Sequence, residues 1–84
     1  MMADAARGKG FGDERYRVLI ASLIRTRTER GLSQQAVADL LGRHQQFVSR
    51  YETGERRLDV VEFVDIVRAL GAEPAELIKS VPHV

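Results

Sequence analysis

Three glycines, Gly31, Gly42 and Gly54, divide the middle of this chain into two short segments, and this spacing constrains the fold more than any other feature. Each segment carries an apolar pattern of helical period, and glycine readily takes the left-handed conformation that ends a helix. Only a few residues separate Gly42 from the next helical segment. Two helices of about nine residues joined so tightly must cross at a steep angle instead of lying antiparallel.

The same reasoning, applied along the whole chain, predicts five helices, over residues 13–30, 33–42, 44–53, 60–70 and 75–80. The first has an apolar stripe at helical spacing, formed by Tyr16, Leu19, Ile20, Leu23 and Ile24. Ser33 is a suitable N-cap for the second, and Asp59 with Glu62 three residues later is typical of a capped start for the fourth. Strand alternation over residues 60–67 would mix apolar and charged side chains on both faces, so a helix is favoured there.

The length of 84 residues limits the chain to one domain with one shared core. Cysteine is absent, so stability has to come from apolar side chains, which make up 44% of the residues. We expect a flexible arm over residues 1–12, the folded domain over 13–80 and a tail over 81–84. No apolar run approaches the roughly 18 residues that a membrane span requires, so we expect a cytoplasmic protein that is neither exported nor embedded.

Charge is unevenly distributed along the chain although the net charge is only +1. Residues 1–14 carry two basic and three acidic groups (−1), residues 15–57 carry nine and four (+5), and residues 58–84 carry two and five (−3). A basic middle suggests a positive face offered to a polyanion, although ordinary solvated surfaces also show asymmetry of this size.

The segment over residues 44–53 combines few apolar residues with many polar ones. If Val48 and Tyr51 point into the core, the outward side carries Gln45, Gln46, Ser49, Arg50 and Thr53. Glutamine can pair with the edge of adenine and arginine with the edge of guanine. Two short crossing helices with such a surface on the second predict a helix-turn-helix DNA-binding domain.

The run GLSQQAVADLLGRHQQFVSRYETGER resembles the Cro and phage-repressor class of helix-turn-helix regulators, also called the xenobiotic-response-element (XRE) family. The matching pattern comprises Gly31-Leu32-Ser33-Gln34, Val37-Ala38, Leu41-Gly42, Val48-Ser49 and Tyr51-Glu52 followed by Gly54. More loosely, the resemblance extends from Leu19 to Leu77. It implies an all-α, five-helix, lambda-repressor-like fold in which the 44–53 helix enters the major groove.

Roles for individual residues follow from this resemblance and from the outward face. Base edges are expected to be contacted by Gln45, Gln46, Ser49 and Arg50. DNA phosphates are expected to be contacted by Gln34, Arg43, Thr53, Arg56 and Arg57. The family pattern also implies a structural salt bridge between Arg27 and Glu52 that would hold the recognition helix at its docking angle.

The chain departs from the family in three places. Many members have proline after the basic loop, where this chain has Leu58 and Asp59, so we expect this loop to be less rigid. Phe47 is bulky for a recognition helix, and three alternatives stay open: packing on the 60–70 helix, contact with a thymine methyl, or contact with a partner subunit. The N-terminal arm, with its basic Arg7 and Lys9, either follows a minor groove or is disordered.

We therefore expect a sequence-specific DNA-binding transcriptional regulator that acts as a homodimer on an inverted repeat. The alternative is an antitoxin or adaptor whose main role is to bind another protein, because the same fold serves both. Apolar residues that either form the dimer interface or fill the core of one subunit are Phe63, Ile66, Leu70, Leu77 and Ile78. No catalytic site, cofactor or metal is expected, since His44 has only His83, near the chain end, as a further imidazole ligand.

Overall fold

The computed structural model describes residues 12–82, so the proposed arm lies outside it apart from its last residue. The described part is all-α, with the elements α2 (Glu14–Glu29), α3 (Gln34–Leu41), α4 (Gln45–Thr53), α5 (Val60–Ala69) and α6 (Pro74–Ile78). This confirms the predicted fold class. The expected and observed boundaries differ by a few residues, most at α6, which begins on Pro74 and ends before the predicted 80.

Local chemistry explains where these helices begin. The Ser33 hydroxyl accepts a hydrogen bond of 3.0 Å from the Ala36 amide at the start of α3. At the start of α5 the Glu62 amide donates to the Asp59 carboxylate at 2.7 Å, and the Glu62 carboxylate accepts from the Asp59 amide at 3.0 Å. This reciprocal arrangement is a capping box, and it satisfies two amides that have no partner inside the helix.

The turn between α3 and α4 depends on Gly42. Its φ angle is +68°, in the left-handed region, where a residue with a β-carbon would be strained. After this turn α4 crosses α3, and Ala38 is fully buried in α3. A methyl group at this position lets the two helices approach closely, because a larger side chain would push them apart.

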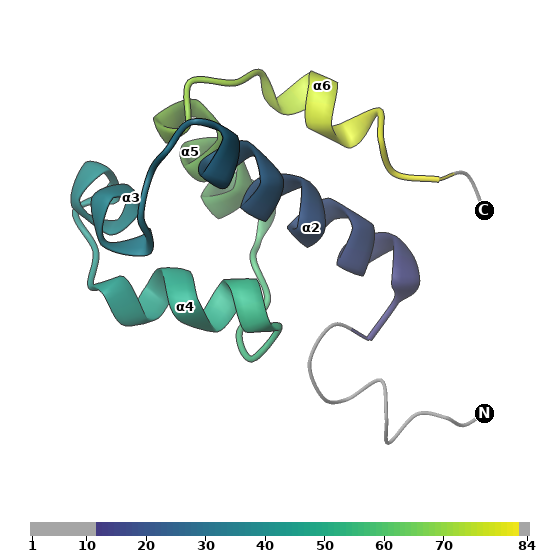
Figure 1. Ribbon diagram of the computed structural model, residues 1–84. Helices are drawn as coiled ribbons and strands as arrows, with labels where there is room; N and C mark the ends of the chain where they lie inside the picture. The colour runs from purple at the N-terminus through teal and green to yellow at the C-terminus, as the bar shows by residue number, and fades with distance from the viewer. Residues whose placement is uncertain (1–11, 83–84) are drawn as a thin grey trace.

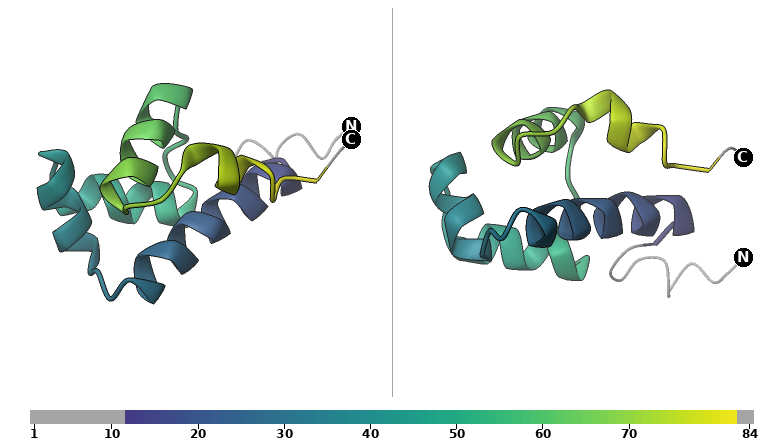
Figure 2. Two further views of the ribbon diagram at one scale, coloured as in Figure 1. Left: turned by 90° about the horizontal axis from the view of Figure 1, so that it is seen from above. Right: turned by 45° about the horizontal axis from the view of Figure 1, so that its top comes forward.

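The core lies among α2, α3, α4 and α5. Its best-covered large side chains, each less than 2% exposed, are Ile20, Leu23, Val37, Val48, Tyr51, Ile66 and Val67. Figure 1 shows α4 along the lower edge of the molecule and α6 along the upper edge, with α2 between them. The right-hand view of Figure 2 keeps this order, so α4 and α6 occupy opposite sides of the domain.

Helix α5 shows which of the apolar candidates serve the core. Phe63, Ile66 and Leu70 are 5%, 1% and 2% exposed, so these three side chains are covered within a single chain. Of the two alternatives left open for these residues, their burial supports the second, filling the core of one subunit. Leu77 is half-buried against the core, and Ile78 is 54% exposed. Exposed apolar side chains lie instead at the start of α5, where Val60 and Val61 are 76% and 69% exposed.

Within residues 12–82 there is no helix long and apolar enough to cross a membrane.

Candidate nucleic-acid interface

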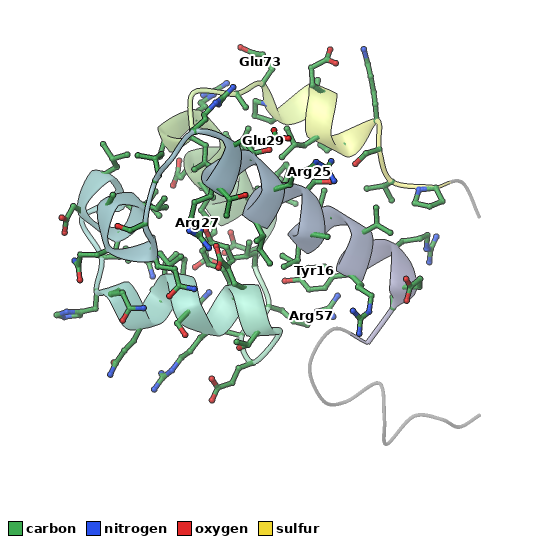
Figure 3. The ribbon with its side chains drawn as sticks, viewed as in Figure 1. Tyr16, Arg25, Arg27, Glu29, Arg57 and Glu73 are labelled. Atoms are coloured by element: carbon green, nitrogen blue, oxygen red, sulfur yellow. The ribbon has the colours of Figure 1, made fainter. Side chains whose placement is uncertain are left out.

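Helix α4 divides its side chains between two environments. Phe47, Val48, Tyr51 and Glu52 are buried against the rest of the domain. Gln46, Arg50 and Thr53 are exposed, and Gln45 and Ser49 are half-buried. Side chains project from α4 away from the other helices, toward the lower edge of Figure 3. The orientation expected from Val48 and Tyr51 is therefore the one found, and a polar surface is presented outward.

A chain of hydrogen bonds links α2, α3 and α4 behind this surface. Arg27 donates from Nε to Glu52 Oε2 at 2.7 Å and from Nη2 to Glu52 Oε1 at 3.0 Å. Gln34 donates from Nε2 to Glu52 Oε1 at 2.8 Å, and Gln45 donates from Nε2 to Gln34 Oε1 at 2.6 Å. The amides of Gln34 and Gln45 are thus oriented by the carboxylate of Glu52.

The Arg27–Glu52 pair implied by the resemblance is present and largely covered, because the two side chains are 14% and 6% exposed. The remaining guanidinium nitrogen of Arg27, Nη1, donates to the Leu32 carbonyl at 2.8 Å. The hydrogen bonds to Glu52 raise the pKa of Arg27 above its ordinary value, so the guanidinium stays charged. Figure 3 shows Arg27 between α2 and α4. A fully hydrogen-bonded ion pair of this kind fixes the position of α4 relative to α2.

Phe47 lies beneath two guanidinium groups. The Cζ atoms of Arg43 and Arg56 are 4.2 Å and 4.9 Å from its ring centroid. The ring is only 9% exposed and meets Tyr51 edge to face at a centroid distance of 5.4 Å. It lines a small pocket together with Glu62 and Ile66 of α5. Of the three alternatives for Phe47, the structure shows the first, packing toward α5.

Glu62 holds both of these arginines. Arg56 donates from Nη1 to Oε1 at 3.0 Å and from Nη2 to Oε2 at 2.8 Å. Arg43 Nη2 lies 3.5 Å from Oε2. The hydrogen bonds from Arg56 and from the Asp59 amide lower the pKa of Glu62 to about 2. The sequence indicated only a helix-capping role for Glu62, because Arg43 is 19 positions away and Arg56, although six positions away, lies in the loop before α5, where no helical period relates it to Glu62.

The loop after α4 is fixed through Tyr16 of α2. The Leu58 amide donates to the Tyr16 hydroxyl at 3.0 Å, and the Cζ atom of Arg57 lies 4.0 Å from the centroid of the Tyr16 ring. Figure 3 shows Tyr16 and Arg57 next to each other. Proline at position 58 could not make this hydrogen bond, because it has no amide hydrogen. The expected loss of rigidity at Leu58 is therefore offset by a contact that the sequence did not reveal.

Most of the predicted site residues lie on the outward side of α4 or in its flanking loops. A groove there is lined by Arg43, His44, Gln46, Phe47, Arg50 and Arg56. Arg57 stands apart from this groove, over Tyr16. Thr53 turns its hydroxyl back to the Arg50 carbonyl at 3.2 Å. His44 is the N-cap residue of α4 and makes no side-chain capping bond.

In residues 12–82, no three histidine, aspartate or glutamate side chains lie close enough together to hold a metal ion. The chemistry that this surface offers is hydrogen bonding from amides and guanidinium groups. Such groups suit base edges and phosphates.

Comparison with known proteins identifies the family. The family described as a helix-turn-helix domain matches residues 21–78. The chain is 36% identical over 58 residues to an uncharacterised HTH-type transcriptional regulator of Sinorhizobium fredii, a match that covers 69% of this chain and 75% of that protein. It is also similar to the solved structure of an XRE-family like protein from Pseudomonas syringae pathovar tomato, with a TM-score of 0.79 and 43% identity, over 81% of this chain and 83% of that one. This chain therefore belongs to the XRE-type family of helix-turn-helix DNA-binding regulators.

Proposed function

We propose that this chain is a sequence-specific transcriptional regulator that binds an inverted DNA repeat as a homodimer. The observation that carries the proposal is the outward face of α4, where Gln46 and Arg50 are exposed while Val48 and Tyr51 are buried. A helix that exposes only polar side chains on the side away from its core can enter the major groove without exposing its apolar side chains.

The polar groups divide into two classes by position. Gln45, Gln46, Ser49 and Arg50 lie along α4 and are assigned to base edges. Gln34, Arg43, Thr53, Arg56 and Arg57 lie at its ends or on neighbouring segments and are assigned to phosphates. For Gln34 a second feature supports the assignment: it is the first residue of α3, and a helix N-terminus attracts anions.

Dimer formation is proposed because α4 has only nine residues and therefore reaches few base pairs. A twofold axis places two recognition helices in successive major grooves about 34 Å apart and doubles the contacts. The contact surface that we propose for the second copy surrounds the start of α5. The aliphatic and phenylalanine side chains that line a groove there are Leu19, Leu58, Val60, Phe63 and Ile78, of which Val60 and Ile78 are the most exposed.

The function is tested by selecting bound sites from a random duplex DNA pool and then measuring the mass of the purified complex. We expect a palindromic consensus and a mass of two chains per duplex. A pool that yields no enriched sequence would overturn the proposal.

Salt dependence separates this function from that of a protein-binding adaptor. If the dimer neutralises about six to ten phosphates, affinity for the selected site should fall about 10³- to 10⁵-fold between 50 and 200 mM salt. An affinity for the best duplex that hardly changes over this range would favour the adaptor.

A further inference from the structure

The cluster of Arg43, Phe47, Arg56 and Glu62 brings together side chains from four parts of the chain: the α3–α4 turn, α4, the α4–α5 loop and α5. Each guanidinium lies over the Phe47 ring and contacts the Glu62 carboxylate. Glu62 is the common partner of the two arginines. Its side chain is only 15% exposed, whereas those of Arg43 and Arg56 are 44% and 41% exposed. A single covered carboxylate thus anchors two exposed cations.

We propose that Glu62 is a positioning residue that sets the DNA sequence specificity of this protein by holding Arg43 and Arg56 in place on Phe47. This inference rests on the proposed function, in which both arginines contact phosphates. The inference goes beyond that function, because it assigns to Glu62, which is not among the proposed DNA contacts, control over the position of the two phosphate contacts. Because phosphate contacts determine the register of a recognition helix, their placement decides which bases α4 meets.

The atoms of Glu62 support a role beyond capping. Oε1 accepts from the Asp59 amide at 3.0 Å and from Arg56 Nη1 at 3.0 Å. Oε2 has no part in the cap: it accepts from Arg56 Nη2 at 2.8 Å and from Arg43 Nη2 at 3.5 Å. Half of the carboxylate therefore serves the arginines alone.

Loss of the carboxylate charge has opposite effects on two kinds of binding. Two released guanidinium groups on flexible stems still attract any phosphate, and the surface becomes more positive, so non-specific affinity is kept or raised. Specific affinity falls, because the arginines must then be ordered when the complex forms. Specificity is the ratio of these two affinities, and it is this ratio that Glu62 raises.

The test uses Glu62→Gln, since glutamine also satisfies a capping box and the helix start is preserved. Dissociation constants are measured at one salt concentration for the selected site and for an unrelated duplex of equal length. We expect the dissociation constant for the unrelated duplex, divided by that for the selected site, to fall about tenfold. A change of this size corresponds to the loss of one charge-assisted contact. Glu73→Gln removes the same charge from an exposed residue at the start of α6, on the side of the domain away from α4 (Figure 3), and serves as the control, with an unchanged ratio.

A thermodynamic cycle separates positioning from a purely structural role. In the Arg56→Gln background, Glu62→Gln should lower the ratio by no more than about threefold, because its main partner is already gone. An equal loss in both backgrounds, or an unchanged ratio for Glu62→Gln alone, would overturn the inference. If the unaltered protein shows no preference among duplexes, the proposed function fails first and this inference fails with it.

Discussion

Arg27 of α2 and Glu52 of α4 form a two-bond ion pair, with N···O distances of 2.7 Å and 3.0 Å, that is almost closed to solvent. Gln34 donates to the same carboxylate and in turn accepts from Gln45. The orientation of the Gln34 and Gln45 amides, which we assign to DNA contacts, therefore depends on an ion pair on the inner side of α4. Under the proposed function, stability and recognition are coupled at this point.

Replacing one member of this pair should destabilise the fold strongly. Arg27→Met leaves the Glu52 carboxylate covered and short of a cation, and we expect the free energy of unfolding to fall by about 3 kcal/mol. Urea unfolding at neutral pH measures it. Lys79→Met, which breaks an ion pair whose side chains are 73% and 67% exposed, should cost much less and is the control. A loss for Arg27→Met no larger than that for Lys79→Met would contradict the structural role.

Glu62 should make stability sensitive to acid. Its pKa in the folded protein is about 2, below the ordinary value of 4.5, so the folded state binds fewer protons than the unfolded state between these values. The resulting stabilisation is present above about pH 4.5 and is lost as pH falls toward 2. Because its arginine partners are partly exposed, we expect the contribution to be about 1–2 kcal/mol.

The measurement compares urea unfolding of the unaltered protein and Glu62→Gln at pH 6 and pH 2.5. The stability difference between them should shrink by most of the stated amount at the lower pH, because pH 2.5 is still slightly above the folded-state pKa of about 2. Other carboxylates titrate in both proteins and cancel in the difference. A difference that is independent of pH would show that the ion pairs of Glu62 contribute nothing.

Tyr16 should stabilise the basic loop through its hydroxyl. Tyr16→Phe keeps the ring beneath Arg57 but removes the acceptor of the Leu58 amide, and we expect a loss of about 1 kcal/mol in unfolding free energy. In a Leu58→Pro background the amide hydrogen is absent, so Tyr16→Phe should cost far less there. Equal losses in the two backgrounds would place the effect of the hydroxyl elsewhere.

The helices and their caps could be predicted because they depend on residues that are close along the chain. Ser33, Gly42 and the pair Asp59 and Glu62 act on amides within a few positions of themselves. Whether an apolar side chain on α5 is buried or exposed depends instead on the positions of the other helices. Val60 and Phe63 share one apolar arc in the sequence, yet one is 76% exposed and the other 5%.

Apart from the Arg27–Glu52 pair, which the family resemblance implied, the inner partners of the candidate site could not be predicted, for the same reason. Glu62 and Arg43 are 19 positions apart, and Leu58 and Tyr16 are 42 apart, so no helical period relates them. Gln45 was identified from its outward position, but its bond to Gln34 joins two different helices. The local sequence pattern predicts which surface is polar and outward-facing. Tertiary structure determines which side chains on that surface are fixed by hydrogen bonds or ion pairs.

The start of α5 should control dimer formation. Val60→Glu places a charge on a side chain that is 76% exposed, at the first helical position, where a carboxylate suits the helix dipole. We expect an unchanged fold and a dimer at least about tenfold weaker by sedimentation equilibrium without DNA, because a buried unpaired charge is costly. Leu40→Glu makes the same change on α3 at a 60% exposed side chain and should leave the dimer intact. Dimerisation of Val60→Glu at the unaltered strength would exclude this surface.

Base reading and phosphate binding should separate in two variants. Gln46 is exposed on α4, and Gln46→Ala should relax the preference at one base position by about 1–3 kcal/mol while leaving the other positions unchanged. Arg57→Ala should weaken binding to all duplexes alike and reduce the slope of log affinity against log salt by about 1. Competition binding with the selected site and its single-base variants measures both. If the two variants altered the same positions to the same extent, the assignment of Gln46 to bases and Arg57 to phosphates would be wrong, since a phosphate contact carries no direct sequence information.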